Sequence, residues 1–428
     1  MPTAPEDRPI RIVVRDDALR RNRLTVLLRL FLALPHLVWL ALWGIAASFV
    51  AIGLWLAVLI EGKAPASLHD FVAGYLRYST HVAAYVFLAA NPFPGFRGAP
   101  GYPIDLEIDP PARQSRWTGA FRLLLALPAA LIAAALGGGL AWTALAGPYA
   151  LAAVFLTGGG VAGAAGLLAW FSSLARGRAP RGLRDLTAYA LGYSAQSGGY
   201  ALLLTGRYPT TDPSTAEPFA ELPAHAVRIA VADDLTRPRL VVLLRLFLAM
   251  PHFLWLALWG LAALAAVVAA WLVALVRGRV PSLLHSFLAA YVRYAVHVLA
   301  FVTLVGRRFP GFTGRAGSYG IDVVLPEPGP QRRLTVLARL ALAIPALIVA
   351  NALGTALWVV AFLGWWYALV RGSMPAGLRD LGATCIRYNA QTYAYLLLLT
   401  DRYPYAGPVL AARTRRTPLP DFYAGKTL

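Results

Sequence analysis

Charged residues are scarce in this sequence of 428 residues. Asp, Glu, Lys and Arg make up 14% of it, hydrophobic residues make up 58%, and the mean hydropathy is +0.60. Soluble domains contain about 25% charged residues. The run 36–60 contains no Asp, Glu, Lys or Arg at all. Because about 20 apolar residues span a bilayer, the composition excludes an ordinary soluble domain and predicts an integral membrane protein.

Residue types that particular chemistries need are also missing. Cys385 is the one cysteine, so an intramolecular disulfide is excluded. No group of His, Cys and Glu has metal-ligand spacing. No nucleotide-binding or nucleophile-elbow motif occurs between a predicted strand and a predicted helix, where such motifs function. We therefore predict no metal, no cofactor and no catalytic residue. The absence of a recurring nucleophile favours a non-enzymatic role, although a membrane-embedded enzyme stays a less favoured alternative.

Acidic residues are half as frequent as basic ones, which gives a net charge of +19, and 37 of the 39 basic residues are Arg. The basic residues lie beside apolar runs, which favours anionic membrane lipid over nucleic acid as the partner. Protein partners or a homo-oligomer stay open. The bias towards Arg, Ala, Leu and Gly is typical of a GC-rich bacterial genome, and the polar segment 1–17 predicts no cleavable signal peptide.

What the chain has in abundance is internal repetition. The segment LPHLVWLALWG at 34–44 returns as MPHFLWLALWG at 250–260. Each half divides again, because a Gly-x-x-Pro turn is followed by a Tyr sixteen residues after the Gly and later by an aromatic-Pro pair. We predict four repeat quarters and a basic C-terminal tail, with the boundaries 1–100, 101–216, 217–317, 318–407 and 408–428.

Each quarter predicts the same sequence of elements. A short alternating stretch reads as a strand, and four such strands would pair into a small extramembrane sheet in which Arg11 and Arg15 face Asp105 and Glu107. An interfacial helix follows, then an elbow at a proline such as Pro35, then a first span, a Gly-Pro turn and a second span. The fold class is therefore an all-α membrane bundle of about eight spans, in four tandem quarter-repeats and two halves.

This arrangement returns every strand to one face of the membrane. Most Lys and Arg lie in the terminal and inter-quarter segments rather than in the Gly-Pro turns, which predicts a multi-pass plasma-membrane protein with cytoplasmic termini. The second quarter carries a Gly-rich insert near 137–166. Its length favours a broken or re-entrant excursion over a further span, and a loosely packed insert without a role is the alternative.

Polar residues recur at helical spacing inside the second spans, where an unpaired Arg costs about 2.5–3.5 kcal/mol. They are either the lining of a cavity for an anionic or lipid-like ligand, or internal pairs that lock the bundle together. His36 and His252 lie outside this stripe and are interpreted as interfacial side chains near Trp. The candidate stripe comprises Asp70, Arg77, Tyr78, His81, Tyr193, Gln196, Arg293, Tyr294, His297, Asp380, Arg387, Tyr388 and Gln391.

Two segments of the fourth quarter, RGSMPAGLRDL at 371–381 and IRYNAQTYAYLLLLTDRYPY at 386–405, carry a family resemblance together with Arg339 and Pro345. They resemble the bacterial membrane family known as domain of unknown function 4389. The resemblance implies a multi-pass bacterial membrane protein and supplies no reaction, substrate or site. The predicted function is binding of lipid or an anionic ligand, or scaffolding of a membrane complex. A transporter or channel with an Arg/His/Tyr-lined interior is the alternative.

Overall fold

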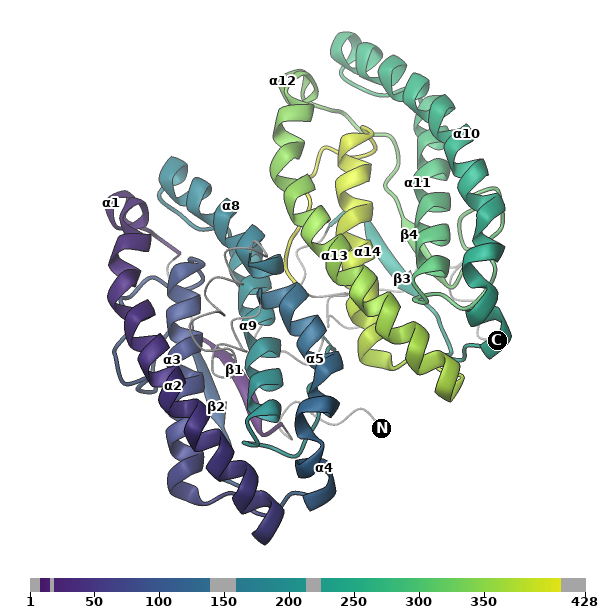
Figure 1. Cartoon of the computed structure of the whole chain (residues 1–428). Coiled ribbons are helices and arrows are strands. Elements are labelled where there is room, and N and C mark those ends of the chain that lie inside the picture. Colours follow the sequence, from purple (N-terminus) through teal and green to yellow (C-terminus); the bar gives the residue numbers. More distant parts are fainter. Residues whose placement is uncertain (1–7, 16–18, 139–158, 213–224, 409–428) are drawn as a thin grey trace. The chain divides into compact units, whose positions relative to one another are not determined.

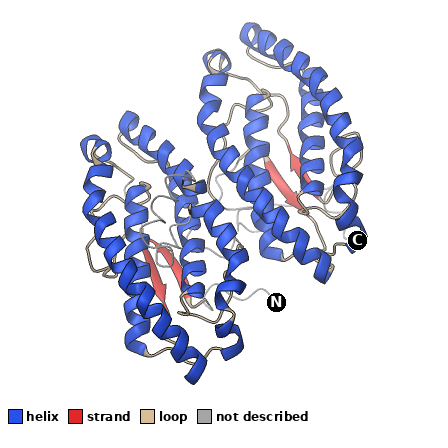
Figure 2. Cartoon of the chain, viewed as in Figure 1, coloured by secondary structure: helices blue, strands red, loops and turns tan. Residues whose placement is uncertain are grey.

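The computed structural model describes residues 8–15, 19–138, 159–212 and 225–408. The chain divides into two compact units, unit 1 over 1–220 with 406–408 and unit 2 over 221–405 with 409–428. Within the described residues, both units are mostly helical and each contains one two-stranded antiparallel sheet (Figures 1 and 2).

Unit 1 contains two strands and seven described helices. In chain order they are β1 (Ile10–Val14), α1 (Arg23–Leu27), α2 (Arg29–Glu61), α3 (Ala66–Val86), β2 (Ile104–Ile108), α4 (Arg116–Ala120), α5 (Arg122–Gly137), α8 (Gly160–Arg176) and α9 (Arg181–Ala201).

Unit 2 follows the same plan with longer outer helices. Its elements are β3 (Arg228–Val231), α10 (Arg239–Arg277), α11 (Ser282–Val302), β4 (Ile321–Val324), α12 (Arg333–Leu337), α13 (Arg339–Arg371) and α14 (Ala376–Leu396).

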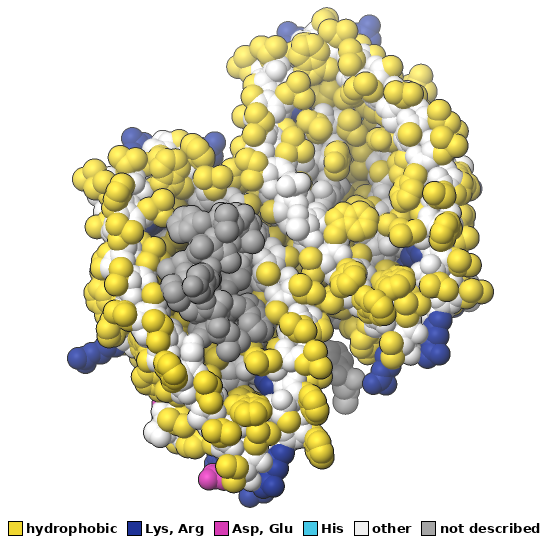
Figure 3. All heavy atoms as spheres, in the orientation of Figure 1, with side chains coloured by type: hydrophobic (Ala, Val, Ile, Leu, Met, Phe, Trp, Pro, Cys, Tyr) yellow, Lys and Arg dark blue, Asp and Glu magenta, His cyan; other side chains and the backbone are white. Residues whose placement is uncertain are grey.

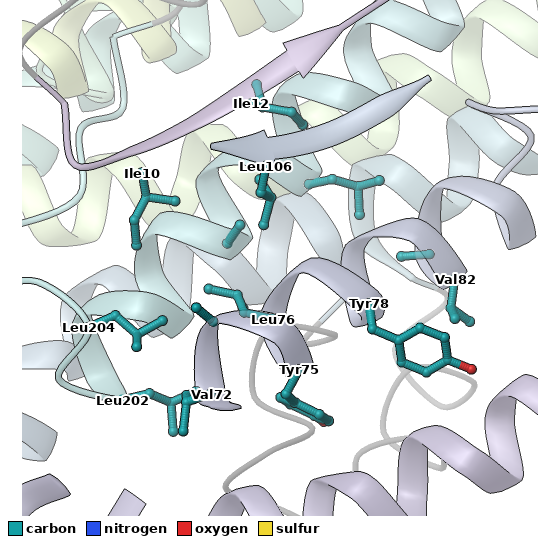
Figure 4. Packing of buried hydrophobic residues seen from close by; sticks show 14 of the residues in the cluster. Ile10, Ile12, Val72, Tyr75, Leu76, Tyr78, Val82, Leu106, Leu202 and Leu204 are labelled. Carbon is teal, nitrogen blue, oxygen red and sulfur yellow. The ribbon is translucent and has the colours of Figure 1, made fainter. Parts of the chain in front are cut away.

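The elements of unit 1 form three layers. The long helix α2 packs on α3, and α5 and α8 pack on α9, so that α3 and α9 form a middle layer. The sheet covers the other side of that layer, with β2 on α3 and β1 on α9. Figure 4 shows Ile12 and Leu106 pointing from the strands towards the helices. β2 belongs to the second quarter but packs on α3 of the first, and β1 belongs to the first quarter but packs on α9 of the second. The two quarters of a unit therefore share one core.

The strands pair within each unit. β1 pairs with β2, and β3 pairs with β4, so the described strands form two sheets and not the single sheet that the sequence predicts. The predicted partners are nevertheless confirmed. Arg11 is the register partner of Glu107, with Nε 3.4 Å from Oε2, and Arg15 Nη2 lies 4.0 Å from Asp105 Oδ2.

The sheet also lies at a different depth from the one expected. Arg77, in the middle of α3, donates from Nε to the Leu106 carbonyl of β2 at 3.0 Å. On the other helix of the layer, a Cβ added at Gly192 would be 2.9 Å from Ile12. The strands therefore run alongside the middle of the second helices, and not beyond their ends.

Each end of unit 1 brings together segments that the predicted topology separates by a bilayer. Arg20, before α1, forms a β-bridge with Arg178 in the second quarter's Gly-Pro turn. At the opposite end of α2, Lys63 bridges Arg113 in the same way. Unit 2 repeats this with Thr236 and Ser373, and with Arg279 and Pro330. The prediction that all opening segments lie on one side and all turns on the other is therefore wrong.

The helix break near the start of each first long helix also differs from the prediction. α2 continues through Pro35, and α10 continues through Pro251. In the first quarter the break lies at Leu28, between α1 and α2, immediately before Arg29. A proline in a helix interior removes one hydrogen bond but does not have to end the helix, so the predicted elbow is wrong at these positions.

The second quarter replaces one long helix with two, α5 and α8. Gly138 directly follows α5 and Gly159 directly precedes α8, and both glycines have left-handed backbone conformations. Their backbones adjoin so closely that a Cβ on Gly138 would collide with Gly159. The chain thus leaves and re-enters the helical layer at one point. The predicted excursion itself lies mostly at 139–158, outside the described residues.

The outer helices carry the apolar surface. Four described helices are long and apolar enough to cross a membrane by length and composition, namely α2, α10, α11 and α13. Within an apolar stretch of 18 residues, only 22% of α2 and 17% of α10 is buried inside the protein. Figure 3 shows hydrophobic side chains over most of the face formed by the outer helices α2, α10 and α13, with basic residues mostly at its rim. The chain is therefore a membrane protein by its apolar helices, and four of the eight expected spans meet the criteria for a span.

Candidate functional site

The polar stripe of α3 ends in a buried ionic cluster around Asp105 of β2. His81 Nε2 lies 2.8 Å from Asp105 Oδ1, and Arg77 Nε lies 3.7 Å from the same oxygen. The backbone N–H groups of Gly101 and Leu106 donate to the carboxylate at 2.7 and 2.8 Å. Burial alone would raise the pKa of Asp105, but these hydrogen bonds and His81 lower it overall. The carboxylate is therefore held ionised inside the unit.

Unit 2 builds the same cluster around Asp322 of β4. His297 Nε2 lies 2.9 Å from Asp322 Oδ1, and Arg293 Nε lies 3.6 Å from it. Arg293 also donates to the carbonyls of Val323 and Gly314, at 3.3 and 3.2 Å. The two predicted Arg/His pairs thus each meet an acidic residue that lies on a strand.

The second helices of the other two quarters, α9 and α14, use glutamine at the same place. Gln196 accepts from the Thr210 N–H at 3.2 Å. Gln391 accepts from the Tyr405 N–H at 3.1 Å and donates to the Val227 carbonyl at 3.0 Å. Arg387 donates to the carbonyl of Tyr405 at 3.2 Å. Here both glutamines bind the backbone of neighbouring segments.

The stripe tyrosines point the other way, into the outer helices. The Tyr78 hydroxyl lies 2.7 Å from His36 Nδ1, and Trp43 stacks on the Tyr78 ring. Tyr294 and His252 repeat the contact at 2.7 Å. His36 and His252 are both 0% exposed. The interpretation of these histidines as interfacial side chains is therefore wrong. Tyr193 and Tyr388 are likewise buried.

The two stripe aspartates of the second helices do not join the clusters. Asp70 has a side chain that is 78% exposed and lies 3.5 Å from His69 Nδ1. Asp380 Oδ1 lies 2.7 Å from Arg379 Nε. Both residues stand near the Gly-Pro turns, whereas Arg77, His81, Arg293 and His297 are brought together with the strands.

An arginine near the start of each outer helix was not among the predicted site residues, yet it recurs in every quarter. The Arg29 guanidinium lies 4.3 Å from the Tyr85 ring centroid and donates to the carbonyls of Tyr85 and Ala90, at 2.8 and 3.1 Å. Arg339 does the same with Tyr395 and Thr400. These arginines bind the carbonyls that the end of each second helix leaves without partners. The full set is Arg29, Arg122, Arg245 and Arg339.

The polar side chains of this site can bind a ligand by hydrogen bonds and ion pairs, or can hold helices and strands of one unit together. Among the described residues, no group of three or more His, Cys, Asp and Glu could hold a metal ion. Cys385 is fully buried. One stripe residue, Gln196, lines a small cavity of about 240 Å³ together with Arg8 and Arg207. The larger apolar groove of unit 2 is lined by the stripe's neighbours, such as Tyr291 and Asn389.

Comparison with known proteins gives one result. The family model described as domain of unknown function (DUF4389) matches residues 23–97, 239–313 and 333–406, just over half of the chain. These segments are the cores of the first, third and fourth quarters. A search of curated proteins and a search of solved structures returned no match.

Proposed function

Because this chain belongs to the DUF4389 family, whose description assigns no activity, we propose its function from the geometry of each unit. The protein is a non-enzymatic lipid-binding scaffold. In each unit, the outer helices lie along the plane of a leaflet of the bilayer, and the sheet faces water. Its partners are membrane lipids, chiefly anionic ones.

The position of the sheet carries this proposal. Among the described residues, β1 and β2 form a sheet of two strands beside the middle of α3 and α9. Glu107 of β2 is 58% exposed and Asp109, just after it, is 44% exposed. Open sheet edges do not occur in contact with lipid hydrocarbon. If α3 and α9 stood upright in the bilayer, this sheet would lie at membrane depth. With the helices in the plane, the sheet faces water.

The outer face of the same unit has the opposite character. Exposed large hydrophobic residues follow α2 for its whole length, among them Phe31, Leu42, Phe49 and Ile60. Amphipathic helices that lie in an interface bury their apolar faces about 5–10 Å into the boundary of headgroups and acyl chains. Exposed Arg20, Arg178 and Lys63 stand at the two ends of this face, where they would meet anionic headgroups.

In this proposal the polar stripe has a structural role. Arg77 and His81 fasten β2 to α3, and Gln391 fastens the backbone before β3 to α14. The alternative is a carrier or channel in which the helices span the bilayer. The sheets would then have to line a water-filled cavity, because irregular backbone is tolerated at membrane depth only there or inside protein.

Single-cysteine labelling separates the two. In a Cys385→Ser background, Lys63→Cys and Arg178→Cys place thiols at opposite ends of unit 1. A membrane-impermeant maleimide is applied to intact cells and to inverted membrane vesicles. Helices in the membrane plane predict that both thiols react from the same side. Spanning helices predict reaction from opposite sides, and that result overturns the proposal.

Arg20→Cys is the matched control. Arg20 forms a bridge with Arg178, so its thiol must react from the same side as that of Arg178→Cys in either orientation. A disagreement between these two positions would mean that the ends of unit 1 are not paired as described, and the proposal would fail with them.

A further inference from the structure

Unit 2 contains an apolar groove between its two outer helices. Phe253 and Leu256 of α10 form one wall, Trp358 of α13 forms the other, and α11 and α14 form the floor. The groove has a volume of about 450 Å³. This lies within the range of about 300–1,000 Å³ that is usual for small-ligand sites.

The surroundings of the groove indicate what fills it. Its walls belong to α10 and α13, two of the helices that are long and apolar enough to cross a membrane. The wall residues Phe253 and Trp358 are 46% and 56% exposed, so the mouth is as apolar as the face around it. If this surface contacts the bilayer, an acyl chain can enter the groove directly from the hydrocarbon. The chain then never has to be transferred through water.

Unit 1 provides an internal comparison, because the same floor is closed there. Ser194 of α9 occupies the repeat position of Asn389 and is 3% exposed, with α5 packed against it at Gly137. In unit 2, Tyr393 on the floor is 49% exposed, and a Cβ added at Gly354, the counterpart of Gly137, would meet nothing within 4 Å. Among the described residues, the exposed floor is thus found in unit 2, whereas Ser194 at the matching position of unit 1 is buried against α5.

We infer that this groove binds one acyl chain of a bilayer glycerophospholipid, held between α10 and α13 on the floor made by α11 and α14. The inference rests on the proposed contact between the outer helices and lipid. The floor supplies a few polar groups, at Tyr291, Asn389 and Tyr393, beside a mostly aliphatic surface. The bound lipid becomes part of the folded unit and covers the apolar floor between α10 and α13.

The test uses the full-length protein in vesicles of phosphatidylethanolamine and phosphatidylglycerol that contain a phosphatidylethanolamine with a diazirine on its acyl chain. After illumination, labelled peptides are located by mass spectrometry. We expect label on the groove floor, at Tyr291 or Tyr393, in addition to label on the outer faces of α10 and α13.

Ala295→Phe fills the floor, and Ala262→Phe adds the same side chain to an exposed position of α10 that does not line the groove. We expect floor labelling to fall severalfold in Ala295→Phe and to stay unchanged in Ala262→Phe. Thermal melts of both variants establish that they are folded, and Ala257→Phe, at the groove wall, replaces Ala295→Phe if that variant is not.

The outcomes are distinct. Label on the outer faces with none on the floor, or equal floor labelling in the groove and control variants, overturns the groove and leaves the proposed function standing. No label on either outer helix overturns the proposed function itself. Native mass spectrometry of the detergent-extracted protein identifies the source, since a retained free fatty acid in place of a phospholipid would contradict the inference.

Discussion

The helices α3 and α9 occupy equivalent places in unit 1 but bind neighbouring segments by different chemistry. α3 uses two basic side chains and the carboxylate of Asp105, whereas α9 places Gln196 at the position that His81 occupies on α3. Unit 2 repeats the difference between α11 and α14. The position therefore needs a polar link between helix and neighbouring backbone, and a charge is one of two ways to provide it.

The four arginines at the starts of the outer helices show the contrasting case. Arg29, Arg122, Arg245 and Arg339 all lie over an aromatic ring and donate to backbone carbonyls. Near each of these sites the chain adopts a left-handed conformation at a leucine, for example Leu88 and Leu398. A non-Gly residue is strained there, and the arginine stabilises the strained turn. No neutral substitute occurs in any quarter.

The largest expected effect on stability comes from removing the carboxylate of Asp105, which binds Arg77 and His81 of α3. Asp105→Ala leaves His81 and Arg77 beside an empty site and removes the acceptor of two backbone N–H groups. Breaking a buried ion pair by deleting one partner costs about 3–5 kcal/mol. We expect a loss of that size in the free energy of unfolding, measured by denaturant titration in detergent micelles.

Asp322→Ala tests the same change in unit 2, and Asp70→Ala is the control. The Asp70 side chain is 78% exposed, so its removal should alter the unfolding free energy by no more than about 0.5 kcal/mol. Equal effects of Asp105→Ala and Asp70→Ala would show that the cluster contributes nothing to folding.

A smaller effect is expected on the glutamine side. Gln391→Leu keeps the volume but leaves the Val227 carbonyl and the Tyr405 N–H without their side-chain partner. An unsatisfied buried polar group costs about 1–3 kcal/mol, so this variant should be less destabilised than Asp322→Ala in the same unit. The same detergent titration measures both. A loss as large as that of Asp322→Ala would remove the distinction between the two sides.

The smallest effect is a dependence of stability on pH. Burial lowers the pKa of His225 below its ordinary value of 6.5, while its Nδ1 accepts from the Val227 N–H at 3.0 Å. The unfolded chain therefore binds this proton more readily, and stability is complete above pH 6.5 and declines as the pH falls below it. The lowered pKa of Asp105 adds a second decline in more acid solution, below its ordinary value of 3.8.

Melting temperature in detergent from pH 8 to pH 5 measures the first decline. The slope should be shallower in His225→Gln than in the unaltered protein. Identical slopes would exclude His225 as a source of the pH dependence.

The parts of the fold that could be predicted are those that depend on residues close together in the sequence. Alternation located the strands, apolar runs located the long helices, and charge complementarity set Arg11 and Arg15 opposite Asp105 and Glu107. The Gly-x-x-Pro spacing marked every turn between a first and a second helix, as at Gly62 and Gly278. Each of these signals lies within a few residues of the feature that it predicts.

The parts that were missed depend on contacts between distant segments. Nothing in the periodicity of 102–110 tells which helix β2 covers, and the contact between His81 and Asp105 spans two quarters. His36 looked interfacial because its neighbours on the helix are tryptophans, but its place is decided by Tyr78, 42 residues further on. A usable signal was present, since a strand aspartate follows each quarter that has both Arg and His in its second helix.

The crossing of strands between quarters has a consequence for synthesis on the ribosome. The chain completes α3, with Arg77 and His81 on it, before their partner Asp105 has been synthesised. The gap from His81 to Asp105 is 24 residues. At about 5–20 residues per second, the nascent helix waits on the order of one to five seconds for its counter-charge. The first quarter of each unit therefore cannot complete its packing until the ribosome has synthesised the opening strand of the second quarter.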